Sequence, residues 1–487
     1  MALAPITESG DMALRRVPPS YPPPQAAPYG PEEAYPEFGG RLLPEPCPGA
    51  PNNPIFAAVR GLLRDLGLDA GRFGSAEWNP LGALVPGGSR ILVKPNWVLH
   101  RNQRPGGGMD CMVTHPAVLR AVLEYVFLAK PREVVLGDAP LQGCDFAALQ
   151  GYGGLPEVLE SFARRGLKIE VRDFRRTVLE QGTEGARAVS ENVRDEFNYV
   201  LARLGANSFL EPISKDWRRF RVTMYDPRLM ARHHRPGQHD FLLAREVMDA
   251  DLVVNCPKLK THKKAGITCC LKNLIGINGN KEYLPHHRKG ALEARRGGDS
   301  HGTQWWLVDA LESALDLINR HRDWPRTYAF AERWIYRIED HVVRRRDPAA
   351  QMEGNWHGND TIWRTCLDLN RALLYGDVDG TLRDTPQRQE LSIVDGVVAG
   401  QGEGPLEPFA LPTGALFAAR NPAAGDFLAA RLLGFSPAKI PIVSHSCDAI
   451  ANPICTLGAE ALAQAAERLV ADAGDAFPPA VPPMGWA

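Results

Sequence analysis

The chain contains in succession "RILVKPN" (90–96), "THPAVLRAVLEYVFLAK" (114–130) and "REVVLGD" (132–138). The first and third runs are short, apolar and rich in β-branched residues, which predicts two buried strands. The middle run has apolar residues at helical spacing, with Thr114 or His115 as its cap and Pro116 in its first turn. A strand, a helix and a second strand in this order predict a parallel pair joined by a right-handed crossover.

The same alternation continues along the chain. "LPEVLESFARRG" (155–166) and "LKIEVRD" (167–173) predict another helix and a third strand. We expect further strands at 250–260, 391–396 and 413–420 and a helix at 421–434. The fold is therefore predicted to be α/β, with a mostly parallel central sheet and flanking helices.

Changes in composition suggest how the chain is divided. Proline is dense near both ends, which favours extended segments, and residues 301–375 have the spacing of helices. We predict the following parts: a proline-rich N-terminal arm (1–54), the first part of the α/β domain (55–300) with a polar insertion at about 174–245, a helical insertion (301–390), the last part of the α/β domain (391–475) and a C-terminal tail (476–487). The arm is expected to lie outside the sheet.

Charge and cysteine content narrow the function. Fifty-six Lys and Arg nearly balance 57 Asp and Glu, so no global field favours nucleic acid as a partner. No run approaches the roughly 20 apolar residues that span a bilayer, and the beginning of the chain lacks the apolar core of a secretory signal. Nine cysteines without a C-x-x-C make an iron-sulfur cluster unlikely. We expect a cytoplasmic protein without a membrane partner.

Polar side chains gather where the predicted strands end. In an open parallel sheet the carboxyl ends of the strands meet at one edge, where ligands bind. We therefore predict a crevice at this edge, lined by Lys94, Asn96, Asp138, Asp173, Lys258, Lys260, His262 and Asp395. Polar residues also end strands for purely structural reasons, which would account for any one of these positions.

The segment "VNCPKLKTHKKAGITCCLKNLIG" (254–276) carries five lysines and a histidine. In an extended strand, Lys258, Lys260 and His262 would point to one side and form a cationic ladder. Burial and neighbouring cations lower the pKa of a lysine, so Lys260 is predicted to exchange protons near neutral pH. The alternative is a solvated basic loop, although apolar residues alternate with the charges.

These segments, together with "IVDGVVAGQGEGP" and "GDFLAARLLGF", resemble the domain of unknown function 362 family over about residues 90–436. The resemblance implies no established activity. Some relatives carry ferredoxin-type cysteine motifs, which this chain lacks. The positions that match the family here are Lys94, Pro95, Asn96, Thr114, His115, Pro116, Asp138, Lys258, Lys260, His262, Lys272, Asn273, Asp395, Gly396 and Asp426.

Several positions have competing interpretations. Asp426 lies in a predicted helix and can be explained as a cap or as a partner of Arg431. Gly402 and Gly404 could let backbone amides approach an anion, although glycine-rich loops are common. His286 and His287 could form a lid, with surface histidines as the favoured alternative. The adjacent Cys269 and Cys270 are interpreted as small buried residues.

A metal is the remaining question about this crevice. Asp138, Asp395 and Glu403 could bring carboxylates together, and such oxygen ligands suit Mg²⁺ on a phosphorylated substrate. Apart from a candidate Mg²⁺, the sequence does not identify a cofactor.

We therefore expect an enzyme that acts on a small carboxylated or phosphorylated metabolite by acid/base chemistry, as an isomerase, lyase or transferase. The predicted catalytic residues are Lys260, Lys258, His262, Asp138 and Asp395, and the predicted substrate-binding residues are Lys94, Asn96, His115, Lys272, Asn273, Gly402 and Gly404. The alternatives are a redox protein and a non-catalytic anion-binding or scaffold protein.

Overall fold

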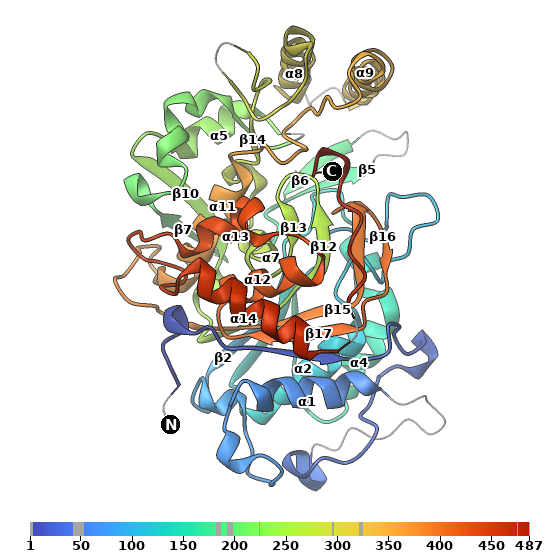
Figure 1. Ribbon diagram of the computed structural model, residues 1–487, viewed down its shortest axis with the longest axis vertical. Coiled ribbons are helices and arrows are strands. Elements are labelled where there is room, and N and C mark those ends of the chain that lie inside the picture. Colours follow the sequence, from blue (N-terminus) through green and yellow to red (C-terminus); the bar gives the residue numbers. More distant parts are fainter. Residues whose placement is uncertain are drawn as a thin grey trace.

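The structure is a computed structural model that describes residues 3–41, 53–181, 187–191, 198–223, 225–294, 297–320, 325–474 and 476–486. Its central feature is one large sheet (Figure 1). Five neighbouring strands in this sheet are parallel, and two antiparallel strands extend one side, which confirms the predicted mostly parallel α/β fold. The order is β1 (Met12–Arg16), β17 (Ala415–Ala419), β15 (Gln389–Glu403), β11 (Leu252–Cys256), β2 (Arg90–Pro95), β3 (Glu133–Asp138) and β4 (Glu170–Asp173).

Helices cover both faces of this sheet. Side chains alternate along β2, so that Ile91 and Val93 lie in one core and Leu92 in another. The first core also contains the apolar residues of α1 (Pro54–Asp65), α2 (Pro116–Leu128) and α4 (Leu155–Ala163). The helices of the opposite cores are α7 (Cys270–Asn273), α11 (Ile362–Tyr375), α12 (Pro422–Leu432) and α14 (Ala459–Asp472).

The predicted strand at 250–260 is two strands. β11 ends at Cys256, and β12 (Lys258–His262) begins after Pro257. Proline has no N–H to continue the ladder, which explains the break. β15 is long enough to pair with both: Asn255 lies opposite Ser392, and Lys258 opposite Asp395. β12 also pairs with β13 (Gly266–Thr268), and β16 (Glu407–Leu411) pairs with the end of β15.

The expectation that the N-terminal arm lies outside the sheet is wrong. Its β1 pairs with β17 over five residues, from Met12 opposite Ala419 to Arg16 opposite Ala415. The prolines surround this short stretch without entering it, and an edge strand needs only one partner. The arm then continues to Tyr21, whose side chain reaches Lys258.

The remaining elements lie around this body. The region from 174 to 245 contains small sheets and a short helix: β5 (Thr177–Gln181) with β6 (Arg187–Glu191), β7 (Tyr199–Arg203) with β10 (Gln238–Ala244) and β9 (His234–Arg235), β8 (Phe220–Arg221) with β14 (His287–Arg288), and α5 (Pro227–His233). Shorter helices are α3 (Phe146–Gln150), α6 (Arg245–Met248) and α13 (Pro441–Ser444).

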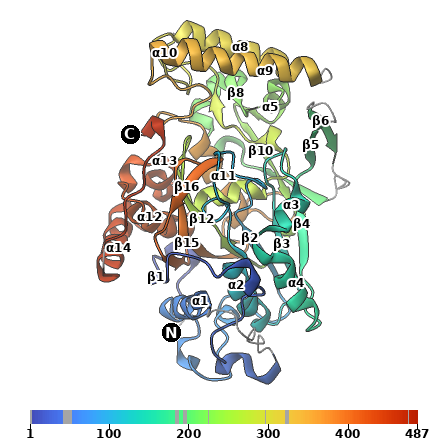
Figure 2. The same ribbon diagram turned by 90° about the vertical axis from the view of Figure 1, so that its right-hand side faces the viewer.

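The helices predicted at 301–390 divide into two groups. α8 (Trp305–Arg320), α9 (Pro325–Ile338) and α10 (Arg344–Arg346) lie together at one end of the molecule (Figures 1 and 2). α11, in contrast, is almost entirely buried in the central cores. Among the described residues, no helix is both long and apolar enough to cross a bilayer.

Candidate functional site

Several of the polar side chains predicted at the carboxyl ends of the strands converge, whereas Asp173 pairs with Arg175 at 2.6 Å instead. Asn273 on α7 accepts hydrogen bonds through Oδ1 from Lys94 Nζ (3.3 Å) and Asn96 Nδ2 (2.8 Å). Asn96 Oδ1 in turn accepts from Lys260 Nζ at 2.7 Å. Lys94 and Lys260 therefore belong to one buried network, which also contains Asn255, because Asn273 Nδ2 donates to Asn255 Oδ1 at 2.7 Å.

Lys94 uses its whole hydrogen-bonding capacity inside the protein. Its ammonium group contacts Asp138 Oδ1 (2.8 Å), Pro95 O (2.8 Å) and Asn273 Oδ1 (3.3 Å), one acceptor for each N–H. Burial lowers the pKa of Lys94, against the opposing effect of Asp138. Asp138 also accepts from the amides of Trp97 and Ala139. All three N–H groups of Lys94 have acceptors within the protein, so none is free to bind a substrate as predicted.

Lys258 is similarly saturated at the other side of the network. Its ammonium contacts Tyr21 Oη (2.6 Å), Asp395 Oδ2 (2.7 Å) and Val398 O (3.3 Å). Asp395 accepts further hydrogen bonds from the Tyr21 hydroxyl and from the amide of His115. The predicted catalytic pair Lys258 and Asp395 is thus an internal, fully buried ion pair.

Lys260 has no carboxylate partner. It is fully buried, and its Nζ has two acceptors, Asn96 Oδ1 at 2.7 Å and Met112 O at 2.5 Å. Burial and, to a smaller extent, the nearby Lys258 and Lys272 lower the pKa of Lys260 to about 7. The direction predicted for Lys260 is confirmed. Of its two predicted same-strand neighbours, Lys258 contributes to the shift.

Lys272 has neither a hydrogen bond nor an ion pair among the described residues, although only 6% of it is exposed. Burial lowers its pKa. Its charge also lowers the pKa of several nearby basic groups, so Lys272 belongs to a cluster of basic side chains that comprises Lys94, Lys260, His262, Lys264, Lys281 and His286.

The histidines of this cluster are neutral, with His262 buried and His286 half-buried. Burial lowers the pKa of His262 well below its usual value, and Lys272 is the largest charged contributor. His262 Nδ1 accepts from the amides of Lys264 (3.0 Å) and Ala265 (3.2 Å), so the ring proton lies on Nε2. The expected surface position is wrong for His287, which is 3% exposed, whereas His286 is half-buried. Burial lowers the pKa of each histidine well below its usual value.

Other predicted binding residues are used within the fold. His115 caps α2 by accepting from the amide of Ala117, and its ring stacks on Tyr21 at 3.9 Å between centroids. The amide of Gly402 donates to Val481 O, and that of Gly404 donates to Gly402 O. These two amides are therefore not free to cradle a phosphate.

The three carboxylates predicted to hold Mg²⁺ are not brought together. Asp138 forms an ion pair with Lys94, and Asp395 forms one with Lys258. Glu403 instead pairs with Lys263 at 3.2 Å and is about one third exposed. Each carboxylate has its own lysine, and β15 carries Glu403 eight residues beyond Asp395. The two other buried partners, Tyr21 and Lys281, were missed: Tyr21 comes from the proline-rich arm, and Lys281 Nζ donates to Ala139 O at 2.9 Å.

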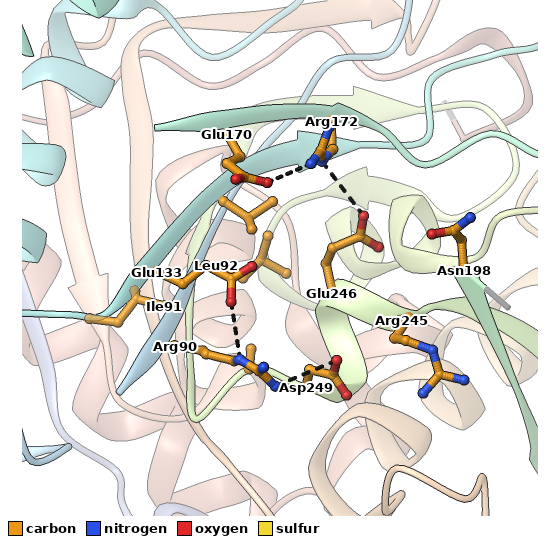
Figure 3. A pocket seen from close by; sticks show the side chains of 12 residues that line it. Arg90, Ile91, Leu92, Glu133, Glu170, Arg172, Asn198, Arg245, Glu246 and Asp249 are labelled. Carbon is orange, nitrogen blue, oxygen red and sulfur yellow. Dashed lines mark hydrogen bonds and ion pairs between the residues drawn. The ribbon is translucent and has the colours of Figure 1, made fainter. Parts of the chain in front are cut away.

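A surface pocket of about 190 Å³ lies at the opposite edge of the sheet, where β2 and β3 begin (Figure 3). Its charged groups are already paired, with Arg90 on Glu133 (3.0 Å) and Arg172 on Glu170 (2.5 Å). The pocket is separate from the buried lysine cluster and offers no unbalanced charge of one sign.

Comparison with known proteins identifies related sequences. A thylakoid-associated protein of Synechocystis sp. is 26% identical over 245 residues, which are 50% of this chain and 53% of that protein. The chain thus spans about half the length of this curated relative. A crystal structure of a Thermotoga maritima protein matches with a TM-score of 0.29 and 10% identity, covering 73% of this chain and 52% of that one. The sequence profile of the Domain of unknown function (DUF362) matches residues 171–431, more than half of the chain, and the protein belongs to this family.

Proposed function

We propose that this protein is an enzyme that binds a small carboxylated or phosphorylated metabolite at Lys272 and changes it by acid/base chemistry at Lys260. The reaction class is an isomerase, lyase or transferase reaction. The observation that carries the proposal is Lys272, which is only 6% exposed and whose ammonium has neither a hydrogen bond nor an ion pair among the described residues.

An isolated buried charge is costly, because the protein interior replaces the hydration of the ion poorly. Lys94 and Lys258 offset this cost with carboxylates at 2.8 and 2.7 Å. Lys272 has no such compensation among the described residues, and it repels the buried lysines Lys94 and Lys260. An anionic ligand would supply the missing charge, and a phosphate or carboxylate has the oxygen acceptors that an ammonium requires.

Lys260 has the properties of a general base. A neutral amine has two N–H bonds and one lone pair, and Lys260 has two acceptors within the protein, Asn96 Oδ1 and Met112 O. When both N–H bonds are used in this way, the lone pair is left to take a proton. A pKa of about 7 makes this neutral form abundant at physiological pH.

His262 completes the proposed site as a neutral donor. Its Nδ1 is held by two backbone amides, so Nε2–H is the remaining polar group of the ring. A neutral imidazole N–H can hydrogen-bond to a developing oxyanion without adding charge. The ion pairs Lys94–Asp138 and Lys258–Asp395 hold the strand ends around these groups. Asn273 and Asn96 connect Lys94 with Lys260.

The first experiment identifies the ligand. Mass spectrometry of small molecules released from gently purified full-length protein is expected to find a carboxylate or phosphate compound. Elemental analysis of the same sample tests for a metal. A released compound without an acidic group would contradict the proposal.

Calorimetric titration with the released compound then separates the roles of the lysines. Lys272→Met is expected to weaken binding by about 10- to 100-fold, because the charge partner is lost. Lys260→Met is expected to retain binding and to lose about 10²- to 10⁴-fold in turnover. Lys263→Met is the matched control, since Lys263 lies in the same segment but is about one third exposed.

Two outcomes favour the other classes. If Lys260→Met abolishes binding and Lys272→Met does not, the lysines form an anion clamp and the protein is a non-catalytic binder. If the released compound is a redox cofactor, the redox alternative replaces the proposal. The cytoplasm is the proposed compartment, and the free thiols of the described cysteines agree with a reducing environment.

A further inference from the structure

Two thiols and one carboxylate meet in the core beside the candidate site. Cys269 is the N-cap of α7 and Cys270 is its first residue, and Asp426 lies on α12, which packs against α7. One ligand atom from each of the three residues lies within 4.8 Å of the other two, and all three side chains are buried. This group is distinct from the lysine network, which involves the far end of α7.

The carboxylate of Asp426 is the unusual member of this group. The residue is fully buried, and neither carboxylate oxygen has a hydrogen-bond partner in the described part of the chain. Arg431, the partner expected from the sequence, pairs with Glu467 at 2.8 Å instead. Burial raises the pKa of Asp426 to about 7, although the amides of Cys270 and Leu271 and the thiols of Cys269 and Cys270 lie near enough to lower it. A buried carboxyl without a partner needs a physical reason.

The distance between the thiols is that of two ligands on one metal ion. Cys269 Sγ and Cys270 Sγ are 3.7 Å apart. In a tetrahedral site with zinc–sulfur bonds of about 2.3 Å, two thiolate sulfurs are about 3.8 Å apart. The close approach of α12 also depends on Gly425, where a Cβ would lie 2.5 Å from Cys270 Sγ.

We propose that Cys269, Cys270 and Asp426 bind a thiophilic divalent metal ion, of which Zn²⁺ is the representative. Two sulfurs and one carboxylate oxygen are ligands that Zn²⁺ accepts, whereas Mg²⁺ requires oxygen ligands. Binding displaces the protons of the two thiols and of the carboxyl to solvent, and the ion gives the Asp426 oxygens a partner.

The position of this metal site connects it to the proposed function without depending on it. α7 is only four residues long, and its second half supplies Lys272 and Asn273 to the lysine network. A metal bound at Cys269 and Cys270 would fix the first half of this helix to α12. The segment "CCLKN" would then have a metal-binding half and a ligand-binding half.

The test uses Co²⁺ as a spectroscopic substitute for Zn²⁺ on full-length, metal-stripped protein under anaerobic, reducing conditions. We expect one equivalent to bind, with a sulfur-to-cobalt charge-transfer band that Zn²⁺ displaces. Cys269→Ala and Cys270→Ala should each reduce this band, and the double variant should abolish it. Asp426→Asn should keep the band and weaken affinity more than about tenfold.

Cys256→Ala is the matched control, because Cys256 is equally buried but lies outside the group, and its spectrum should equal that of the wild type. Circular dichroism verifies that each variant is folded. The proposal is overturned if folded wild-type protein gives no charge-transfer band, or if the double variant retains it. It is also overturned if intact-mass analysis of protein purified without reductant shows a stable disulfide between the two cysteines that reductants do not open. Loss of metal binding leaves the ligand-release experiment unaffected, so the two proposals fail separately.

Discussion

Two kinds of buried lysine lie side by side in the candidate site. Lys94 and Lys258 each contact a carboxylate and two further acceptors. Lys260 has two neutral acceptors and no carboxylate, and Lys272 has no hydrogen-bond or ion-pair partner among the described residues. All four are at least nine-tenths buried, so burial alone does not distinguish them. The four lysines therefore differ in their partners: two have a carboxylate within the fold, and two have none among the described residues.

Removing the carboxylate of a paired lysine should have the largest effect on stability. Asp395→Asn leaves the Lys258 ammonium buried without a counter-charge, and we expect the free energy of unfolding to fall by about 3–5 kcal/mol. Urea unfolding measures it. The double variant Lys258→Met/Asp395→Leu removes both charges and should recover part of the loss. A loss below about 1 kcal/mol in Asp395→Asn would remove the distinction between the two kinds of lysine.

Removing the charge of an unpaired lysine should increase the free energy of unfolding instead of lowering it. Lys272→Met takes an uncompensated charge out of the core, and we expect the ligand-free protein to gain about 1–3 kcal/mol in unfolding free energy. Lys94→Met, in contrast, leaves Asp138 unpaired and should destabilise. Both variants are compared by urea unfolding after ligand and metal have been removed. Destabilisation by Lys272→Met would mean that its ammonium has a native partner.

The pH dependence of stability tests Lys260 itself. Its folded pKa is about 7, below the unfolded value of about 10.4, so the unfolded chain binds more protons between these limits. The Lys260 contribution to stability is therefore smallest below pH 7 and rises with pH, by at most about 1.4 kcal/mol per unit. The unfolding free energy of the wild type minus that of Lys260→Met should rise from pH 7 to pH 9. A flat difference over this range would show that Lys260 stays charged.

The smallest effect is expected at the surface, where Glu403 pairs with Lys263. Glu403→Gln should change the unfolding free energy by less than about 0.5 kcal/mol, because exposed ion pairs contribute little. Differential scanning calorimetry with and without Mg²⁺ also tests the carboxylate site predicted from the sequence. A large Mg²⁺-dependent shift that Glu403→Gln removes would restore that site.

Periodicity and strand ends predicted much of this architecture. The alternation around 90–138 predicted two parallel strands and their crossover helix, and all three are found. Local patterns failed where a distant partner decided the outcome. The short run at Met12–Arg16 becomes a strand because β17 offers a free edge, and the run at 250–260 divides because Pro257 has no N–H for the ladder.

In the candidate site, too, local patterns predicted some features and distant segments decided others. The positions of Lys94, Asn96 and Lys260 near strand ends were sufficient to predict their convergence, because parallel strands align their carboxyl ends. Asp395 lies within the longer β15 and pairs with Lys258. Their partners could not be predicted. Tyr21 reaches Lys258 from an arm more than 230 residues away, and Asp426 reaches the two cysteines from another helix.

The sequence alone indicated the mostly parallel sheet and its polar edge, since these depend on hydrophobic period and on the alternation of strands and helices. It also indicated the direction of the Lys260 pKa shift, but the largest cause of that shift is burial, which the tertiary structure decides. Only the tertiary structure decided which lysines are paired and which are not. That choice depends on distances between atoms of remote segments, and a change of a few ångströms decides whether a buried ammonium has a counter-charge.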